Sequence, residues 1–155
     1  MAMRYLSPVH RAYRQIAIYF EEPCAEVGLI PQEGHLVSYL AAYGPCPVAE
    51  VHRVLGLKRS TLSSMLGRLE ARGLLRRIPH PSDRRSLHVE LEADGRQLAA
   101  TLQERGEALE AAIEQRVDAA DCAGFDAVLA AIAAVTEVEV RPVITQQSAH
   151  EDTEL

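Results

Sequence analysis

The stretch that decides the fold is residues 47–92, PVAEVHRVLGLKRSTLSSMLGRLEARGLLRRIPHPSDRRSLHVELE. In its first half, apolar residues recur at helical spacing in two runs, which predicts helices over about 48–54 and about 59–72. Gly56 lies between the two runs, where a helix that ends in the left-handed conformation favours a residue without a side chain. Two short helices joined by a tight, glycine-containing turn are typical of a helix-turn-helix.

Beyond the second helix, the period of the apolar residues changes from 3.6 to 2. Residues 74–79 and 86–92 are therefore predicted as strands. The side chains of the second strand predicted to face inward are Leu87, Val89 and Leu91. Residues 80–85, HPSDRR, connect the strands and are polar, rich in turn formers and basic, which favours a β-hairpin wing over residues 80–86. The predicted fold class is mainly α with a small β-hairpin wing, a winged helix-turn-helix.

Further helices are predicted on both sides of this unit. A helix over about 5–20 is followed by a connection that begins at Pro23, and a second helix over 31–43 starts with proline, a favoured first-turn residue. Beyond the wing, helices are predicted over about 94–117 and about 123–138. The remaining residues are polar, which predicts a disordered tail.

The apolar positions of the first and last helices exceed what one small winged domain can cover. Those of the last helix include Val128, Leu129, Ile132 and Val135. A second copy of the chain is the natural cover, and its two-fold symmetry matches that of palindromic DNA. The predicted parts are an N-terminal dimerisation helix (1–30), a winged helix-turn-helix domain (31–93), C-terminal dimerisation helices (94–140) and a disordered tail (141–155).

The charge of the chain is unevenly distributed. Residues 53–88 contain nine basic and two acidic side chains, a net charge of +7 within a chain whose net charge is −6. A basic block of this kind is the electrostatic footprint expected of a DNA-binding protein. We find no apolar run close to the roughly 20 residues of a membrane span and no apolar signal-peptide core, so we expect a cytoplasmic protein with no membrane partner.

The second helix of the helix-turn-helix has two different faces. One face is apolar and would pack against the preceding helix; it contains Leu62, Met65, Leu66 and Leu69. The opposite face is small and polar, so this recognition helix can lie deep in the major groove. In the wing, we expect Arg85 in the minor groove, with Asp83 orienting its guanidinium. The expected DNA-binding residues are Lys58, Arg59, Ser60, Thr61, Ser63, Ser64, Arg68, Arg84 and Arg85.

These motifs resemble those of the MarR (multiple antibiotic resistance regulator) family of bacterial transcription factors. The resemblance covers about residues 5–138 and is carried by residues 56–63 (GLKRSTLS), 69–74 (LEARGL), and Asp83-Arg84-Arg85 followed by 91–95 (LEADG). It implies a homodimer with intertwined terminal helices that binds a pseudo-palindromic operator. The resemblance also implies a repressor, released by a small ligand or by cysteine oxidation, and places Asp83 and Arg85 on the family's wing motif.

A ligand pocket is one way in which such a protein could be regulated. The candidate lining residues are His10, Tyr13, Arg14, His35 and Tyr39. The arginine and the histidines would suit a small anionic or aromatic compound, although the same residues also fit ordinary packing and surface positions.

Redox and metal sensing are the other two options. Cys24, Cys46 and Cys122 contain no CxxC pair, so we expect reduced thiols, and Cys46 between two prolines could be accessible. Metal-ligand types occur at Glu21, Glu22, Cys24, Glu33 and His35. Residues 103–116 supply no histidine pair to complete such a site, so we expect no metal and no cofactor.

An enzyme and a protein-protein interaction module are the two alternatives to a DNA-binding protein. The sequence contains no nucleotide-binding glycine loop, no HExxH and no GxSxG, so we expect no enzymatic activity. The alternative is a winged-helix protein-protein interaction module, which would bind DNA weakly and tolerate Arg85→Ala.

Overall fold

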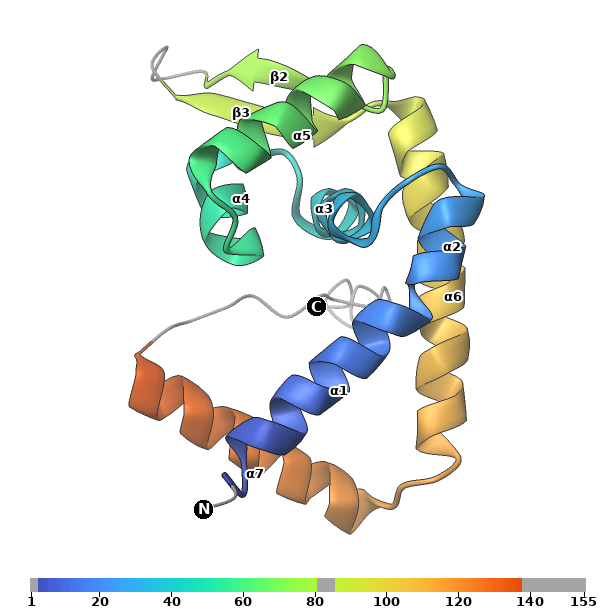
Figure 1. Cartoon of the computed structure of the whole chain (residues 1–155), viewed down its shortest axis with the longest axis vertical. Helices are drawn as coiled ribbons and strands as arrows, with labels where there is room; N and C mark the ends of the chain where they lie inside the picture. The colour runs from blue at the N-terminus through green and yellow to red at the C-terminus, as the bar shows by residue number, and fades with distance from the viewer. Residues whose placement is uncertain (1–2, 81–85, 138–155) are drawn as a thin grey trace, which may run out of the picture. The chain divides into compact units, whose positions relative to one another are not determined.

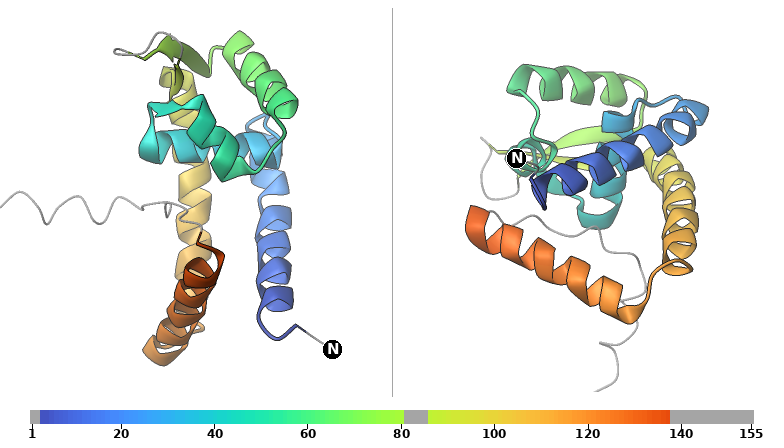
Figure 2. Two further views of the ribbon diagram at one scale, coloured as in Figure 1. Left: turned by 90° about the vertical axis from the view of Figure 1, so that its left-hand side faces the viewer. Right: turned by 60° about the horizontal axis from the view of Figure 1, so that its bottom comes forward.

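The computed structural model describes residues 3–80 and 86–137. The described residues form two compact units. We call residues 32–80 with 86–101 the winged unit, and residues 3–31 with 102–137 the helical unit. The helix α6 (Ala93–Glu114) begins in the winged unit, continues into the helical unit and ends at the turn that leads into α7 (Figures 1 and 2).

The winged unit contains three helices, the first part of α6 and a small sheet (Figure 1). Its helices are α3 (Pro31–Tyr43), α4 (Val48–Leu55) and α5 (Arg59–Ala71). Its strands are β1 (Cys46–Pro47), β2 (Leu75–Pro79) and β3 (Leu87–Leu91), all antiparallel in the order β1-β3-β2. The helix-turn-helix and the hairpin therefore lie at the predicted places in the chain, and the predicted fold class is confirmed.

The core of the winged unit is built from the predicted apolar faces. The side chains of α5 that are at most 2% exposed are Leu62, Met65, Leu66 and Leu69, as their spacing predicts. In the hairpin, Val89 is fully buried and Leu91 is buried opposite Leu75. The prediction for Leu87 was wrong, because this side chain is 44% exposed. Leu87 pairs with Pro79 at the end of the hairpin, far from the buried Leu75–Leu91 pair.

The strand β1 was not predicted. Its two residues lie next to β3, with Cys46 opposite Val89 and Pro47 opposite His88. The Cys46 side chain shares the buried face of the sheet with Val89 and is only 2% exposed, so the expectation that Cys46 could be accessible was also wrong.

The helical unit contains α1 (Leu6–Tyr19), α2 (Glu21–Glu26), the C-terminal part of α6, and α7 (Ala119–Thr136). A connection was predicted where α2 lies; Pro23 occupies the first turn of this short helix, where a missing N–H breaks no helical hydrogen bond. The helix α7 starts four residues earlier than predicted. The side chain of Asp118 accepts hydrogen bonds from the amides of Ala120 and Asp121, and Asp121 completes a capping box.

The terminal helices expose most of their apolar surface. No residue of α1 or α7, both fully described, is buried. On α7, Phe125 is 60% exposed and Val135 is 83% exposed. By length and composition α7 also satisfies the criteria for a membrane span, which the sequence analysis did not anticipate. The predicted tail, residues 141–155, lies outside the described residues.

Candidate nucleic-acid interface

The turn between α4 and α5 leaves the start of α5 open. The helix α4 ends at Gly56, whose φ of 62° is in the left-handed region, and the Gly56 amide donates to the carbonyl of His52. Lys58 precedes α5 in an extended conformation and makes no side-chain cap. The first amides of α5 have no partner within the helix, and the helix dipole is positive at this end, so the position favours a phosphate.

The hydroxyl face of α5 is accessible. The exposed residues on and beside this face are Lys58, Arg59, Ser60, Thr61, Ser63 and Ser64. They lie opposite the buried leucines that fix α5 on the core, so the helix presents small hydrogen-bonding groups next to cationic ones. Such a surface can enter the major groove and can contact both phosphates and base edges.

Several residues of α5 are predicted to contact DNA. Among these, Arg68 alone has a charged protein partner in the part of the chain that the structure describes. Its Nε and Nη2 atoms both donate to Glu33 Oε1, at 3.2 and 3.0 Å. The Glu33 side chain is 7% exposed, whereas that of Arg68 is 56% exposed. The pair therefore joins the first turn of α3 to α5. The sequence analysis missed this contact, since the two residues are 35 positions apart.

Two other arginines of the basic block also have carboxylate partners. Arg77 Nη2 lies 3.0 Å from Glu70 Oε2. Arg76 contacts Glu90 through Nε and Nη2, and its Nε lies 3.4 Å from Glu92 Oε1. The hydrogen bond to Glu90, the charge of Glu90 and then the charge of Glu92 raise the pKa of Arg76 above its ordinary value. These pairs neutralise part of the local positive charge.

The tip of the predicted wing, with Asp83, Arg84 and Arg85, lies outside the described residues. The base of the wing is described. The His80 amide donates to the carbonyl of Ser86 at 2.9 Å, and the rings of His80 and His88 lie 4.7 Å apart. The strands on either side of the wing are thus paired up to its base.

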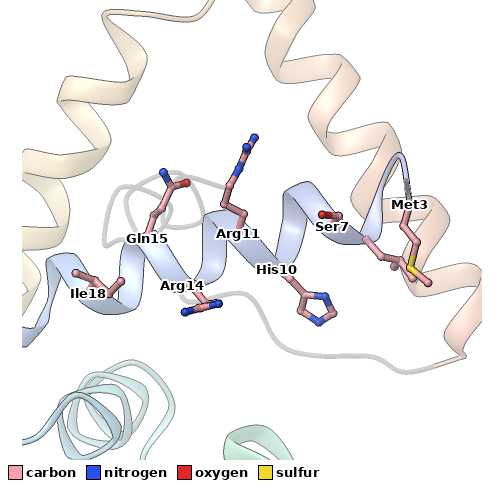
Figure 3. Close-up of a pocket in the computed structure, with 8 residues that line it drawn as sticks. Met3, Ser7, His10, Arg11, Arg14, Gln15 and Ile18 are labelled. Atoms are coloured by element: carbon pink, nitrogen blue, oxygen red, sulfur yellow. The ribbon is translucent and has the colours of Figure 1, made fainter. Parts of the chain in front are cut away.

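The residues predicted to line a ligand pocket fall into two groups. On α1, His10 and Arg14 line a hollow of about 530 Å³ and project to the same side of the helix, whereas Arg11 and Gln15 project to the other side (Figure 3). Tyr13 is 66% exposed and does not line this hollow. The sequence analysis did not name Arg11, which adds a third basic side chain to the lining.

The other two predicted pocket residues lie on α3, in the winged unit. Tyr39 is only 1% exposed, and its hydroxyl donates to Glu50 Oε1 at 2.7 Å. Desolvation lowers the pKa of His35, although part of this side chain remains exposed. A pocket shared by the two groups stays a prediction.

The cysteines differ in their access to solvent. Cys24 and Cys46 are buried, and burial raises the pKa of the Cys24 thiol. Cys122 is exposed. In the described part of the chain, no group of three or more His, Cys, Asp or Glu side chains is placed to hold a metal ion.

Part of the chain is similar to known transcriptional regulators. Residues 27–86 match a family model described as MarR family. The HTH-type transcriptional repressor NicR of Pseudomonas putida is 28% identical over 87 residues, which cover 56% of this chain and 55% of NicR. The match thus spans about half the length of that relative.

Solved structures share the fold over most of the chain. The S. aureus MepR-DNA complex has a TM-score of 0.73 at 16% identity, covering 88% of this chain and 100% of MepR. NadR in complex with 4-hydroxyphenylacetate has a TM-score of 0.76 at 21% identity, covering 85% of this chain and 94% of NadR. At these identities the likeness shows the fold.

Proposed function

We propose that this chain is a transcriptional regulator of the MarR family, whose model matches residues 27–86, and that it is a homodimeric repressor that binds a pseudo-palindromic operator and is released by a small ligand. The observation that carries the proposal is the exposed hydroxyl face of α5, with an open helix N-terminus beside Lys58 and Arg59. This surface has the size, polarity and charge of a major-groove reader.

In the proposed complex, each part of the interface has its own role. Lys58, Arg59 and the first amides of α5 hold phosphates and set the register on the duplex. The hydroxyl groups that reach toward base edges and neighbouring phosphates are those of Ser60, Thr61, Ser63 and Ser64. Arg68 is the remaining α5 residue of the proposed interface. In the wing, Arg85 occupies the minor groove, Asp83 orients its guanidinium, and Arg84 is a further DNA-binding residue.

The exposed apolar side chains of the terminal helices support the dimer. They include Tyr5, Leu6, Ile16, Phe125, Leu129 and Val135. Large apolar side chains left exposed in such number on two helices favour a contact with another protein or a membrane. A two-fold dimer covers it and sets two recognition helices about 34–36 Å apart, one turn of B-DNA. On this proposal α7 forms a subunit interface in a cytoplasmic protein and does not span a membrane.

The relatives support the repressor and ligand parts of the proposal. NicR is a transcriptional repressor, and NadR has been crystallised with 4-hydroxyphenylacetate, an aromatic carboxylate. On α1, His10 and Arg14 line one hollow and project to the same side of the helix. A cationic lining of this kind favours an anionic aromatic ligand. We therefore assign the inducer to that chemical class.

The test begins with selection of tight-binding duplexes from a random pool by the wild-type protein. Fluorescence anisotropy then compares the selected and random duplexes at two salt concentrations, for the wild type and for Arg85→Ala. We expect tight, salt-dependent binding that prefers the selected duplex and weakens in the variant. Weak binding without preference and without dependence on Arg85 would instead favour the protein-protein interaction module.

A further inference from the structure

Glu33 is the one charged residue that is buried among the described residues. A carboxylate taken out of water is stable only with a well-placed partner, because its lost hydration is not otherwise replaced. The guanidinium of Arg68 meets this need with two hydrogen bonds to one oxygen. The position of Arg68, and of the part of α5 that carries it, is therefore tied to the first turn of α3.

A second pair holds α5 from another direction. Glu70 lies two residues beyond Arg68 and is joined to Arg77 on β2. Successive residues turn by 100° around an α-helix, so Arg68 and Glu70 project about 200° apart. One pair anchors α5 to α3 and the other anchors it to the hairpin. A roll of α5 about its own axis would break one of the two.

The roll of a recognition helix decides which of its side chains face the bases. Base readout requires hydrogen bonds at fixed positions in the groove, whereas attraction to the phosphate backbone tolerates small rotations. We infer that Glu33 is a positioning residue for sequence-specific DNA recognition, which acts by holding Arg68 and thereby the orientation of α5. This inference rests on the proposed function, and it assigns to a buried residue outside the DNA surface a role in specificity.

Glu33→Gln is the first variant to measure, because it keeps the shape and one acceptor but removes the charge. We expect the preference for the selected duplex over random duplex to fall about tenfold, equivalent to ~1.4 kcal/mol. Affinity for random duplex and its salt slope should stay unchanged, because Glu33 contacts no phosphate. Glu26→Gln is the matched control: Glu26 also pairs with an arginine, Arg105, at 3.0 Å, but in the helical unit.

Arg68→Gln and the double variant complete a mutant cycle. If Glu33 acts through Arg68, the double variant loses no more preference than the larger single loss. Additive losses would overturn the inference. It would also be overturned if Glu33→Gln raised the salt slope by about one, because Arg68 would then act as a phosphate contact that Glu33 restrains.

Folding is checked by thermal unfolding of every variant. If Glu33→Gln does not fold, Glu33→Asp keeps the charge on a shorter side chain and is expected to lose part of the preference; full preference in this variant would overturn the inference. A wild-type protein without preference for any selected duplex overturns the proposed function, and the inference with it. If Glu33→Gln keeps the full wild-type preference for the selected duplex, the inference is overturned and the proposed function is not.

Discussion

Arg77 of β2 contacts Glu70 of α5 through both its main chain and its side chain. Its amide donates to Glu70 Oε1 at 3.2 Å, and its Nη2 lies 3.0 Å from Glu70 Oε2. A Cβ added at Gly67 would lie 3.7 Å from Arg77 Nη2, an ordinary contact, so the pair does not require glycine there. The positive charge of Arg77 is therefore balanced inside the protein, although in the sequence it counts toward the basic block.

The first prediction follows from this balance and concerns the salt dependence of DNA binding. Arg59→Ala should lower the slope of log affinity against log salt by about one, because Arg59 lies at the open start of α5 and, in the proposed complex, neutralises a phosphate. Arg76→Ala should leave the slope nearly unchanged, because Glu90 and Glu92 already balance Arg76. Anisotropy titrations at several salt concentrations measure both slopes.

The two variants remove the same charge and serve as controls for each other. Equal decreases in slope would show that net charge alone matters and that the ion pairs do not restrict Arg76. If the salt slope decreased in Arg76→Ala and not in Arg59→Ala, the DNA would lie on the hairpin side of the winged unit.

The second prediction concerns the close approach of Gly95, on α6, to the main chain of Leu74. A Cβ at Gly95 would lie 2.0 Å from the carbonyl oxygen of Leu74 and 3.0 Å from its carbon. The same oxygen accepts a hydrogen bond from Glu92, so the main chain has little freedom to move away. Gly95→Ala should therefore lower the free energy of unfolding by about 3 kcal/mol, measured by urea denaturation.

Gly106→Ala is the control on the same helix. Its Cβ would lie 3.9 Å from Phe20 Cζ, an ordinary contact, and alanine favours the helix over glycine by about 1 kcal/mol. This variant should be as stable as the wild type or more stable. Equal destabilisation by both substitutions would contradict the close approach at Gly95.

The third prediction concerns the buried hydroxyl of Tyr39. Tyr39→Phe removes the 2.7 Å hydrogen bond to Glu50, which links α3 to α4, while the ring can keep its packing against Tyr43. Loss of a hydrogen bond to a carboxylate should lower the free energy of unfolding by about 1.5 kcal/mol. Tyr13→Phe, at an exposed position, should change it by less than about 0.5 kcal/mol. Equal stability of the two variants would refute a stabilising role for the Tyr39 hydroxyl.

The sequence predicted those features that depend on neighbouring residues. The spacing of Leu62, Met65 and Leu69 defined the buried face of α5, and the position of Gly56 defined the end of α4. Both depend on helix geometry within a few residues. The early start of α7 was also local, but it depends on the side chain of Asp118, which the sequence analysis did not consider as a cap.

The features that were missed depend on residues far apart in the chain. Cys46 forms a strand only because Val89 lies beside it, and a single residue between two prolines gives no strand pattern. Glu33 follows Pro31 in the first turn of α3, where an acidic residue ordinarily stabilises the helix dipole, so nothing nearby indicated its pairing with Arg68. Tertiary packing sets both contacts.

The last prediction concerns the reactivity of the three thiols. Only the thiolate reacts quickly with Ellman's reagent, and reaction also requires access. Cys122 is exposed, whereas Cys24 and Cys46 are each 2% exposed, and burial also raises the pKa of Cys24. In the native protein Cys122 should react fast, and the two buried cysteines should react only after denaturant is added. Cys122→Ser should lose the fast phase, and mass spectrometry that found rapid labelling of Cys24 or Cys46 in this variant would contradict their burial.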